Sequence, residues 1–280
     1  MKIRNNEVKK EVFCLNQKRG YRTVITDSFW IILTYIKTWF LSVWPLCLIL
    51  GCLFTLLFNF RGYIPLLAGS ILTAYVLSLM VHISHSVLES STEREDALLF
   101  PFSYKKIRHQ LSPAGTTFLT IISFALVSAV LWLLAYRFLW GHLWVYIVTS
   151  VITLVLIILC ILSIYYQVVF KSSLIEAVKW SFSNIFRLFW KTLFISFFSS
   201  CMCAVLGFFL ALPILILDKN IQLSNQAVAL GDPTDFPDYM FWCAPILSII
   251  LLSLASVLFL LMTVPFHLQM HSIYTITKKK

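Results

Sequence analysis

The sequence predicts an all-α integral membrane protein with six transmembrane helices and amphipathic interfacial helices on the cytoplasmic side. Two observations predict this class. Hydrophobic residues make up 60% of the 280 residues and charged residues only 12%, about half the charged fraction of soluble domains. The apolar residues also fall into blocks of more than about 18, which is long enough for a helix to cross a hydrocarbon core of roughly 30 Å.

Six such blocks divide the chain into a basic arm at 1–37, a transmembrane domain at 38–267 and a basic tail at 268–280. Only Arg61 and Gly62 separate the first two blocks, which predicts a tight hairpin. A second hairpin is predicted around Arg137, and a polar loop at 218–238 separates the last two blocks. The predicted spans lie at about 38–60, 63–87, 113–136, 143–170, 192–217 and 239–267.

The distribution of lysine and arginine predicts the orientation of these spans. Cytoplasmic loops retain basic residues, and alternate loops of this chain differ sharply in them. All the basic residues except Arg61, Arg137 and Lys219 lie in the N-terminal arm, the 89–112 loop, the 171–191 segment and the C-terminal tail. The sequence therefore predicts a multi-pass protein of the cell inner (plasma) membrane with both termini in the cytoplasm.

The net charge of +10 is typical of proteins that bind a negatively charged partner, and the two candidates are nucleic acid and anionic lipid. Each basic cluster adjoins an apolar block, and juxtamembrane bases attract anionic headgroups at about 1 kcal/mol each. This pattern favours the lipid bilayer, with anionic headgroups on the cytoplasmic side, and argues against nucleic acid. A membrane-protein partner or a homo-oligomer also remains open.

The segment 173–190 is amphipathic at the helical period and predicts an interfacial helix. Ser173 and Glu176 have the spacing of a capping box, which satisfies backbone N–H groups at a helix start. The apolar side chains on one face are expected to meet acyl chains, and they are Leu174, Val178, Ile185 and Phe189. The predicted membrane-interface residues are Lys179, Trp180, Arg187, Trp190 and Lys191. The alternative is that this segment extends the fifth span into the cytosol.

The same segment, SLIEAVKWSFSNIFRLFW, resembles the amphipathic lead-in of poorly characterised bacterial six-span membrane proteins. These are related to the membrane domain of some glycerophosphodiester phosphodiesterases. The resemblance covers about 20 residues and the six-span layout, and it implies a fold with hardly any function. No phosphodiesterase domain with acidic metal ligands accompanies it here, so that activity is not carried over.

Histidines near the cytoplasmic ends of two spans form the one candidate for chemistry. His82, His85 and Glu89 are spaced i, i+3 and i+7, and His267 and His271 are spaced i and i+4. Each set falls on one helical face. If the second and sixth spans touch, these residues form a metal or proton site. The alternative is that they are ordinary interfacial side chains satisfied by water.

Three function classes remain open. No Asp, Glu, Lys or Arg lies deep in any of the six blocks, which removes the usual machinery of coupled ion transport. No nucleotide-binding, serine-hydrolase or zinc-protease motif is present either. The leading hypothesis is a non-catalytic accessory, assembly or lipid-interacting scaffold without a cofactor. The alternatives are a transporter or channel subunit for an uncharged or lipid-like solute, and a membrane enzyme that uses the histidines.

Overall fold

The computed structural model describes residues 19–34, 36–59, 63–93, 104–138, 143–230 and 239–277. Over these ranges the chain is all-α, as the sequence predicts. Most of the predicted basic arm and the end of the basic tail lie outside the described residues. The helices are α1 (Tyr21–Thr34), α2 (Ile36–Asn59), α3 (Tyr63–Glu93), α4 (Tyr104–Phe138), α5 (Leu143–Phe170), α6 (Leu174–Ala229), α7 (Tyr239–Val257) and α8 (Phe259–Thr277).

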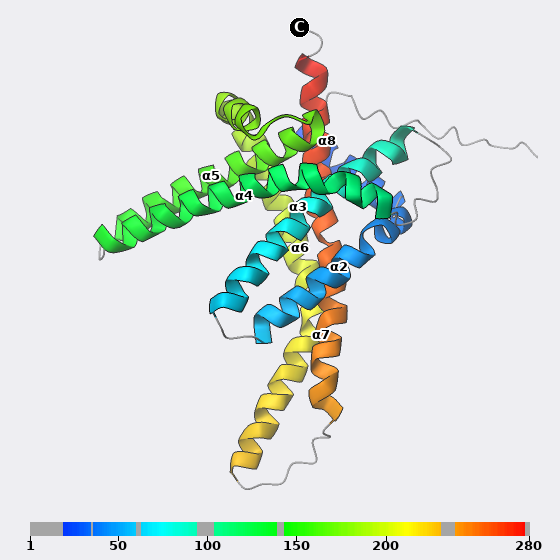
Figure 1. Ribbon diagram of the computed structural model, residues 1–280, viewed down its shortest axis with the longest axis vertical. Helices are drawn as coiled ribbons and strands as arrows, with labels where there is room; N and C mark the ends of the chain where they lie inside the picture. Colours follow the sequence, from blue (N-terminus) through cyan, green and yellow to red (C-terminus); the bar gives the residue numbers. More distant parts are fainter. Residues whose placement is uncertain are drawn as a thin grey trace, which may run out of the picture.

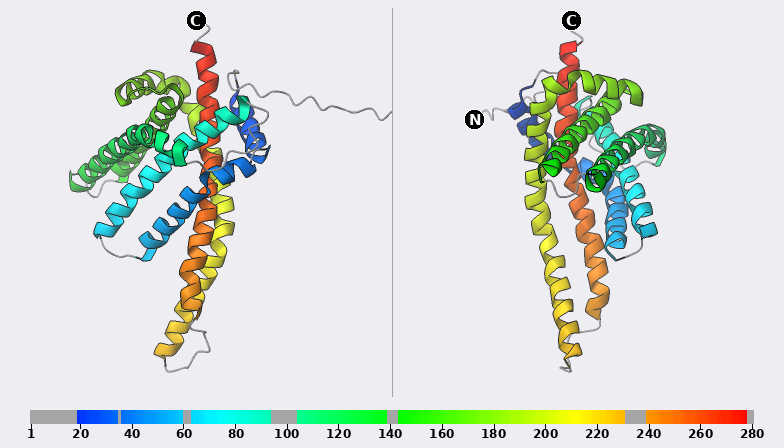
Figure 2. Two further views of the ribbon diagram at one scale, coloured as in Figure 1. Left: turned by 45° about the vertical axis from the view of Figure 1, so that its right-hand side comes forward. Right: turned by 90° about the vertical axis from the view of Figure 1, so that its left-hand side faces the viewer.

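Three helical hairpins diverge from a common end of the molecule (Figures 1 and 2). The hairpins are α2–α3, α4–α5 and α6–α7, and their tips point in different directions. Helix α8 lies at the common end, where it packs against α1 and α6. Helix α2 packs against α7 as well as against α3, so that the first and third hairpins are in contact.

Four of these helices are long and apolar enough to cross a membrane: Leu67–Glu89, Gln110–Arg137, Trp144–Phe170 and Leu174–Ser224. Two further apolar stretches, Val43–Leu53 and Pro245–Ala255, are shorter. Many large apolar side chains on α4, α5 and α6 are exposed, which is the surface that lipid would cover. Over the residues that the structure describes, the chain therefore has the features of a multi-pass membrane protein with four candidate spans.

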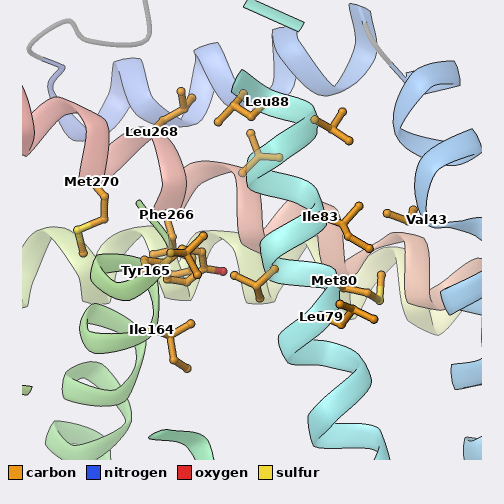
Figure 3. Close-up of a cluster of buried hydrophobic side chains, with 14 of the residues drawn as sticks. Val43, Leu79, Met80, Ile83, Leu88, Ile164, Tyr165, Phe266, Leu268 and Met270 are labelled. Carbon is orange, nitrogen blue, oxygen red and sulfur yellow. The ribbon is translucent and has the colours of Figure 1, made fainter. Parts of the chain in front are cut away.

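The packed core lies at the common end, where α3 and α8 meet α1, α2, α5 and α6. Figure 3 shows α3 in the centre, with apolar side chains on both sides of it. Tyr165 of α5 and Phe266 of α8 lie together beside α3, with ring centroids 5.0 Å apart. Leu268 lies on α8, which packs against α1. Among the described residues, the buried core gathers at this end, which therefore holds the helices together.

Helix α6 differs from the predicted pair of an interfacial helix and a fifth span. It runs over 56 residues: no proline or glycine interrupts the sequence between Leu174 and Gly207, and the helix continues through Gly207 and Pro213. Its first turns nevertheless lie across the common end, and the remainder follows the long axis (Figure 2). The continuity agrees with the alternative that the segment extends the fifth span, whereas the direction of the first turns is that of an interfacial helix.

The predicted sixth span, 239–267, is divided in the structure into α7 and α8. At the junction the N–H of Leu258 donates to the carbonyl of Ala255 at 2.9 Å, which is the tighter i to i−3 pattern. The Leu258 carbonyl accepts the thiol hydrogen of Cys203 on α6, at 3.3 Å. Hydropathy does not reveal this break, because the residues on both sides of it are apolar.

Candidate functional site

The structure brings the two histidine pairs of α3 and α8 together. His82 and His85 lie on α3 and His267 and His271 on α8, and all four are at most 8% exposed. Their ring centroids come within 5.1 Å for His85 and His267 and within 5.3 Å for His85 and His271. The four imidazoles therefore lie inside the packed end of the bundle and not on an exposed interfacial surface.

His85 and His271 meet edge to edge. Their Nε2 atoms are 3.2 Å apart, and the two ring planes differ by only 4°. Because the centroids are as far apart as 5.3 Å, almost all of the separation lies within the ring planes. This is the geometry of a hydrogen bond between two imidazoles, in which one Nε2 donates and the other accepts.

The other two histidines bond to hydroxyl groups. His267 Nε2 lies 3.0 Å from Ser84 Oγ, and its ring packs edge-on against Tyr165, with centroids 4.8 Å apart. His82 Nε2 lies 3.3 Å from Thr117 Oγ1 of α4, and Thr117 is also hydrogen-bonded to Ser78. His267 Nδ1 is buried without a hydrogen-bond partner in the structure.

Glu89 lies at the open side of this cluster, with 47% of its side chain exposed. Its Oε2 is 3.8 Å from Nδ1 of His85, at the edge of the ring away from His271. A metal ion is not favoured by this arrangement. Among the side chains that the structure describes, no three from histidine, cysteine, aspartate or glutamate are placed to share one ion.

The start of α1 closes the common end from another side. Arg19 is 6% exposed, and its Nε donates to Oδ2 of Asp27 at 2.8 Å. Its backbone N–H donates to Ser272 Oγ of α8 at 2.8 Å, and its carbonyl accepts from Lys191 Nζ of α6 at 3.1 Å. Arg19 therefore connects α1, α6 and α8, a role that sequence reasoning missed by counting it only as a cytoplasmic charge.

Side-chain hydrogen bonds also join neighbouring helices through the core. The sequence analysis missed them, although serine, threonine and glutamine at helical spacing within apolar blocks were a signal that could have found them. In membrane proteins such bonds average about 0.6 kcal/mol each and reach about 1.7 kcal/mol. The pairs are Thr120 with Gln167 between α4 and α5 (2.8 Å), Ser163 with Ser181 between α5 and α6 (3.0 Å), and Thr192 with Gln269 between α6 and α8 (2.9 Å).

The start of α6 has both hydrogen bonds of a capping box. The N–H of Glu176 donates to Ser173 Oγ at 3.4 Å, and the N–H of Ser173 donates to Oε2 of Glu176 at 3.2 Å. Lys171, in the short connection from α5, has a positive φ of 51°. This left-handed conformation is typical of the residue that follows a helix end, and it turns the chain from α5 into α6.

The outward face of the first half of α6 combines aromatic and basic side chains. Phe186 is 93% exposed and Trp190 75% exposed. Lys179 and Arg187 are also exposed, at helical positions beside the aromatic rings. We call this set the α6 face; its members are Ile175, Lys179, Phe182, Phe186, Arg187 and Trp190.

Other predicted interface residues point into the protein. Trp180 is half-buried and stacks on Tyr166, with ring centroids 4.4 Å apart. Lys191 is half-buried through its bond to the N-terminal segment, and Ile185 is only 8% exposed. The prediction that Ile185 meets acyl chains is wrong, because α6 packs this face against its neighbours in the bundle.

Comparison of the chain with protein-family models, with curated proteins and with solved structures gave no match. The resemblance of the 173–190 segment to the lead-in of bacterial six-span proteins therefore stays a prediction.

Proposed function

We propose that this chain is a six-span protein of the inner (plasma) membrane that acts as a non-catalytic, lipid-interacting scaffold, with both termini in the cytoplasm. The observation that carries the proposal is the α6 face. Its aromatic side chains are exposed, and basic side chains lie beside them on a helix that crosses the end of the bundle (Figure 2). This combination matches the boundary between acyl chains and anionic headgroups.

The six-span arrangement adds α2 and the α7–α8 pair to the four long apolar helices. Val43–Leu53 of α2 and Pro245–Ala255 of α7 are apolar, and their helices lie against each other, which supports placing them in a further pair of spans. The hairpin axes diverge in Figure 1, and a bilayer requires them to lie more nearly parallel, since helices in bilayers tilt by about 0–40°. Lipid contact with the exposed faces of α4 and α5 would favour that closure.

Lipid retention tests the proposal. The full chain, purified in mild detergent, is incubated with phosphatidylglycerol or phosphatidylcholine, and the bound lipid is counted by native mass spectrometry. We expect preferential retention of phosphatidylglycerol, and a several-fold loss of it in the double variant Lys179→Gln and Arg187→Gln. The matched control is Lys219→Gln, an exposed base in the second half of the same helix.

Equal retention of the two lipids by the wild-type protein would contradict the proposal. An equal loss in the Lys219→Gln control would show that any base on α6 acts alike, and would remove the special role of the α6 face.

A further inference from the structure

The hydrogen bond between His85 and His271 joins α3 to α8, and the scaffold function does not use it. Both rings are buried, and their Nε2 atoms are 3.2 Å apart. Two Nε2 atoms can share a hydrogen bond only while one of them has no proton. When both imidazoles are protonated, two N–H groups of two cations face each other and the bond is lost.

We propose that His85 and His271 form a proton-binding site that holds α8 against α3 and opens when both imidazoles are protonated. The chemistry is proton uptake from water alone. Each ring gains one hydrogen on the nitrogen that lacks it, and no electron is transferred. The ligand of this site is therefore the proton.

The ring geometry favours a proton over a metal ion between the two nitrogens. Two imidazoles that bind one metal direct their lone pairs at a common third point. Here the ring planes are nearly parallel and the two Nε2 atoms are at a hydrogen-bond distance of 3.2 Å. The described side chains also supply no third ligand in position.

Basic groups lie near the pair on two sides. Lys171, from the connection before α6, is near His85, and Arg19, from the segment before α1, is near His271. Asp27 of α1 neutralises part of the Arg19 charge through their 2.8 Å ion pair. His82 of α3 and His267 of α8 are neutral polar neighbours that become positive if protonated, and Tyr165 of α5 packs on His267.

Glu89 carries the opposite charge. Its carboxylate is 3.8 Å from Nδ1 of His85 and stabilises a proton on that ring while the site is closed. The direction of the pH dependence of opening follows from the protons that each form binds. The closed site binds fewer protons than the open, hydrated site, so that a falling pH favours the open form. Glu89 is four residues from His85 on the same helix, so it favours that proton in the open form as well. Removal of the Glu89 charge weakens proton binding by His85, and opening should then need a lower pH.

Hydrogen–deuterium exchange of α8 tests the proposal on the full chain in nanodiscs. Protection of the amides in 264–273 is compared at about pH 7.5 and pH 5, after correction for intrinsic exchange. We expect wild-type protection to fall roughly tenfold at the lower pH, the effect of one buried hydrogen bond and the repulsion that replaces it. His271→Gln should lose this difference, and Glu89→Gln should show the fall at a lower pH than wild type.

His82→Gln is the matched control, because His82 lies on the same helix but bonds to Thr117 of α4 instead of α8. It should keep the pH response. Constant α8 protection at the two pH values, the same fall in His271→Gln, or a response lost in His82→Gln would each overturn the proposal.

A measurement on the wild-type protein keeps the proposal falsifiable if His271→Gln does not fold. In protein labelled with ¹⁵N-histidine, solid-state NMR detects the coupling between the two Nε2 nuclei through their shared hydrogen. We expect this coupling at neutral pH and its disappearance on acidification. A neutral sample without it would overturn the assignment.

Discussion

At Gly51, α2 comes so close to α7 that a side chain has no room. A Cβ atom built there would lie 2.6 Å from the carbonyl oxygen of Ile249 and 3.0 Å from the backbone nitrogen of Ser253. Both are backbone atoms and cannot move aside without moving α7. Small residues allow membrane helices to approach in this way. We expect Gly51→Ala to lower the stability of the folded protein by about 1–3 kcal/mol, as overpacking does.

Thermal unfolding in detergent measures this effect, with Gly115→Ala as the control. Gly115 is inside α4, and no atom lies within 4 Å of a Cβ built there. Its replacement should stabilise by about 0.5–1 kcal/mol, because alanine suits a helix interior better than glycine does. If both variants behave alike, the close approach of α2 and α7 is not a constraint.

Thr120 and Gln167 should respond unequally to mutation, although they share hydrogen bonds. The Gln167 amide is 3% exposed and bonds to Thr120 in both directions, at 2.8 and 3.2 Å. Thr120→Val removes this partner from a buried amide and should cost about 1–3 kcal/mol. Gln167→Leu leaves the Thr120 hydroxyl bonded to the Thr116 carbonyl at 3.0 Å and should cost less.

The double variant should recover most of the Thr120→Val loss, since it leaves neither polar group unsatisfied. Unfolding in detergent with increasing denaturant gives the four free energies of this cycle. If the losses of stability in the two single variants add up in the double variant, the two side chains do not hydrogen-bond to each other.

Sequence spacing predicted part of the candidate site. The i, i+3 and i+4 intervals placed each histidine pair on one helical face, and the structure brings the two faces together. Spacing along the sequence could not predict the tertiary packing, that is, which helix lies opposite each histidine face. Thr117, Tyr165 and Arg19 come to the cluster from three further segments, so no pattern within a single block could have indicated them.

At the scale of elements, the two faces of α6 should behave differently in a bilayer. Phe186 and Trp190 are exposed, whereas Ile185 is buried against the protein. Burial of a large apolar side chain contributes about 1.5–3 kcal/mol, and each surface base contributes about 1 kcal/mol. The double variant Phe186→Ser and Trp190→Ser should therefore release the segment from the interface more completely than Lys179→Gln with Arg187→Gln.

Spin labels report this release by their accessibility to oxygen and to an aqueous quencher. In the otherwise unchanged chain, a label at Phe186 should be accessible to oxygen, a label at Ser183 to the aqueous quencher, and a label at Ile185 to neither. Equal aqueous access all round the helix would mean that the first turns of α6 project into the cytosol.

The boundaries of the elements show where hydropathy stops being informative. The fourth predicted span, 143–170, has the bounds of α5. A polar residue precedes its first residue, and charged and polar residues follow its last. Helix α4 begins at Tyr104, nine residues before the predicted span at 113, because the residues ahead of the apolar block also form helix. A lipid-length window detects the part of a helix that lipid can cover, and not the hydrogen-bonded turns beyond it.

At the scale of the whole molecule, polar bonds concentrate at the common end while apolar side chains cover the diverging hairpins. The histidine cluster, the Arg19 contacts and the bond between α6 and α8 all lie around α8. The hairpins, by contrast, expose apolar faces along α4, α5 and α6. We infer that the common end sets the order of the helices and that lipid sets the angles between the hairpins.

This division predicts a topology in which the common end faces the cytoplasm and the tips face outward. In a chain without its native cysteines, Thr23→Cys and Ser183→Cys mark the common end, and Arg137→Cys and Gln226→Cys mark two tips. All four positions are exposed, so a labelling difference reports the side of the membrane and not burial.

An impermeant maleimide should label Arg137→Cys and Gln226→Cys in intact cells, and the other two only after permeabilisation. The physical reason is that the basic residues flank the common end and resist translocation. Labelling of Arg137→Cys and Gln226→Cys from opposite sides would contradict the paired hairpins. The reverse pattern at all four positions would contradict the cytoplasmic assignment of the common end.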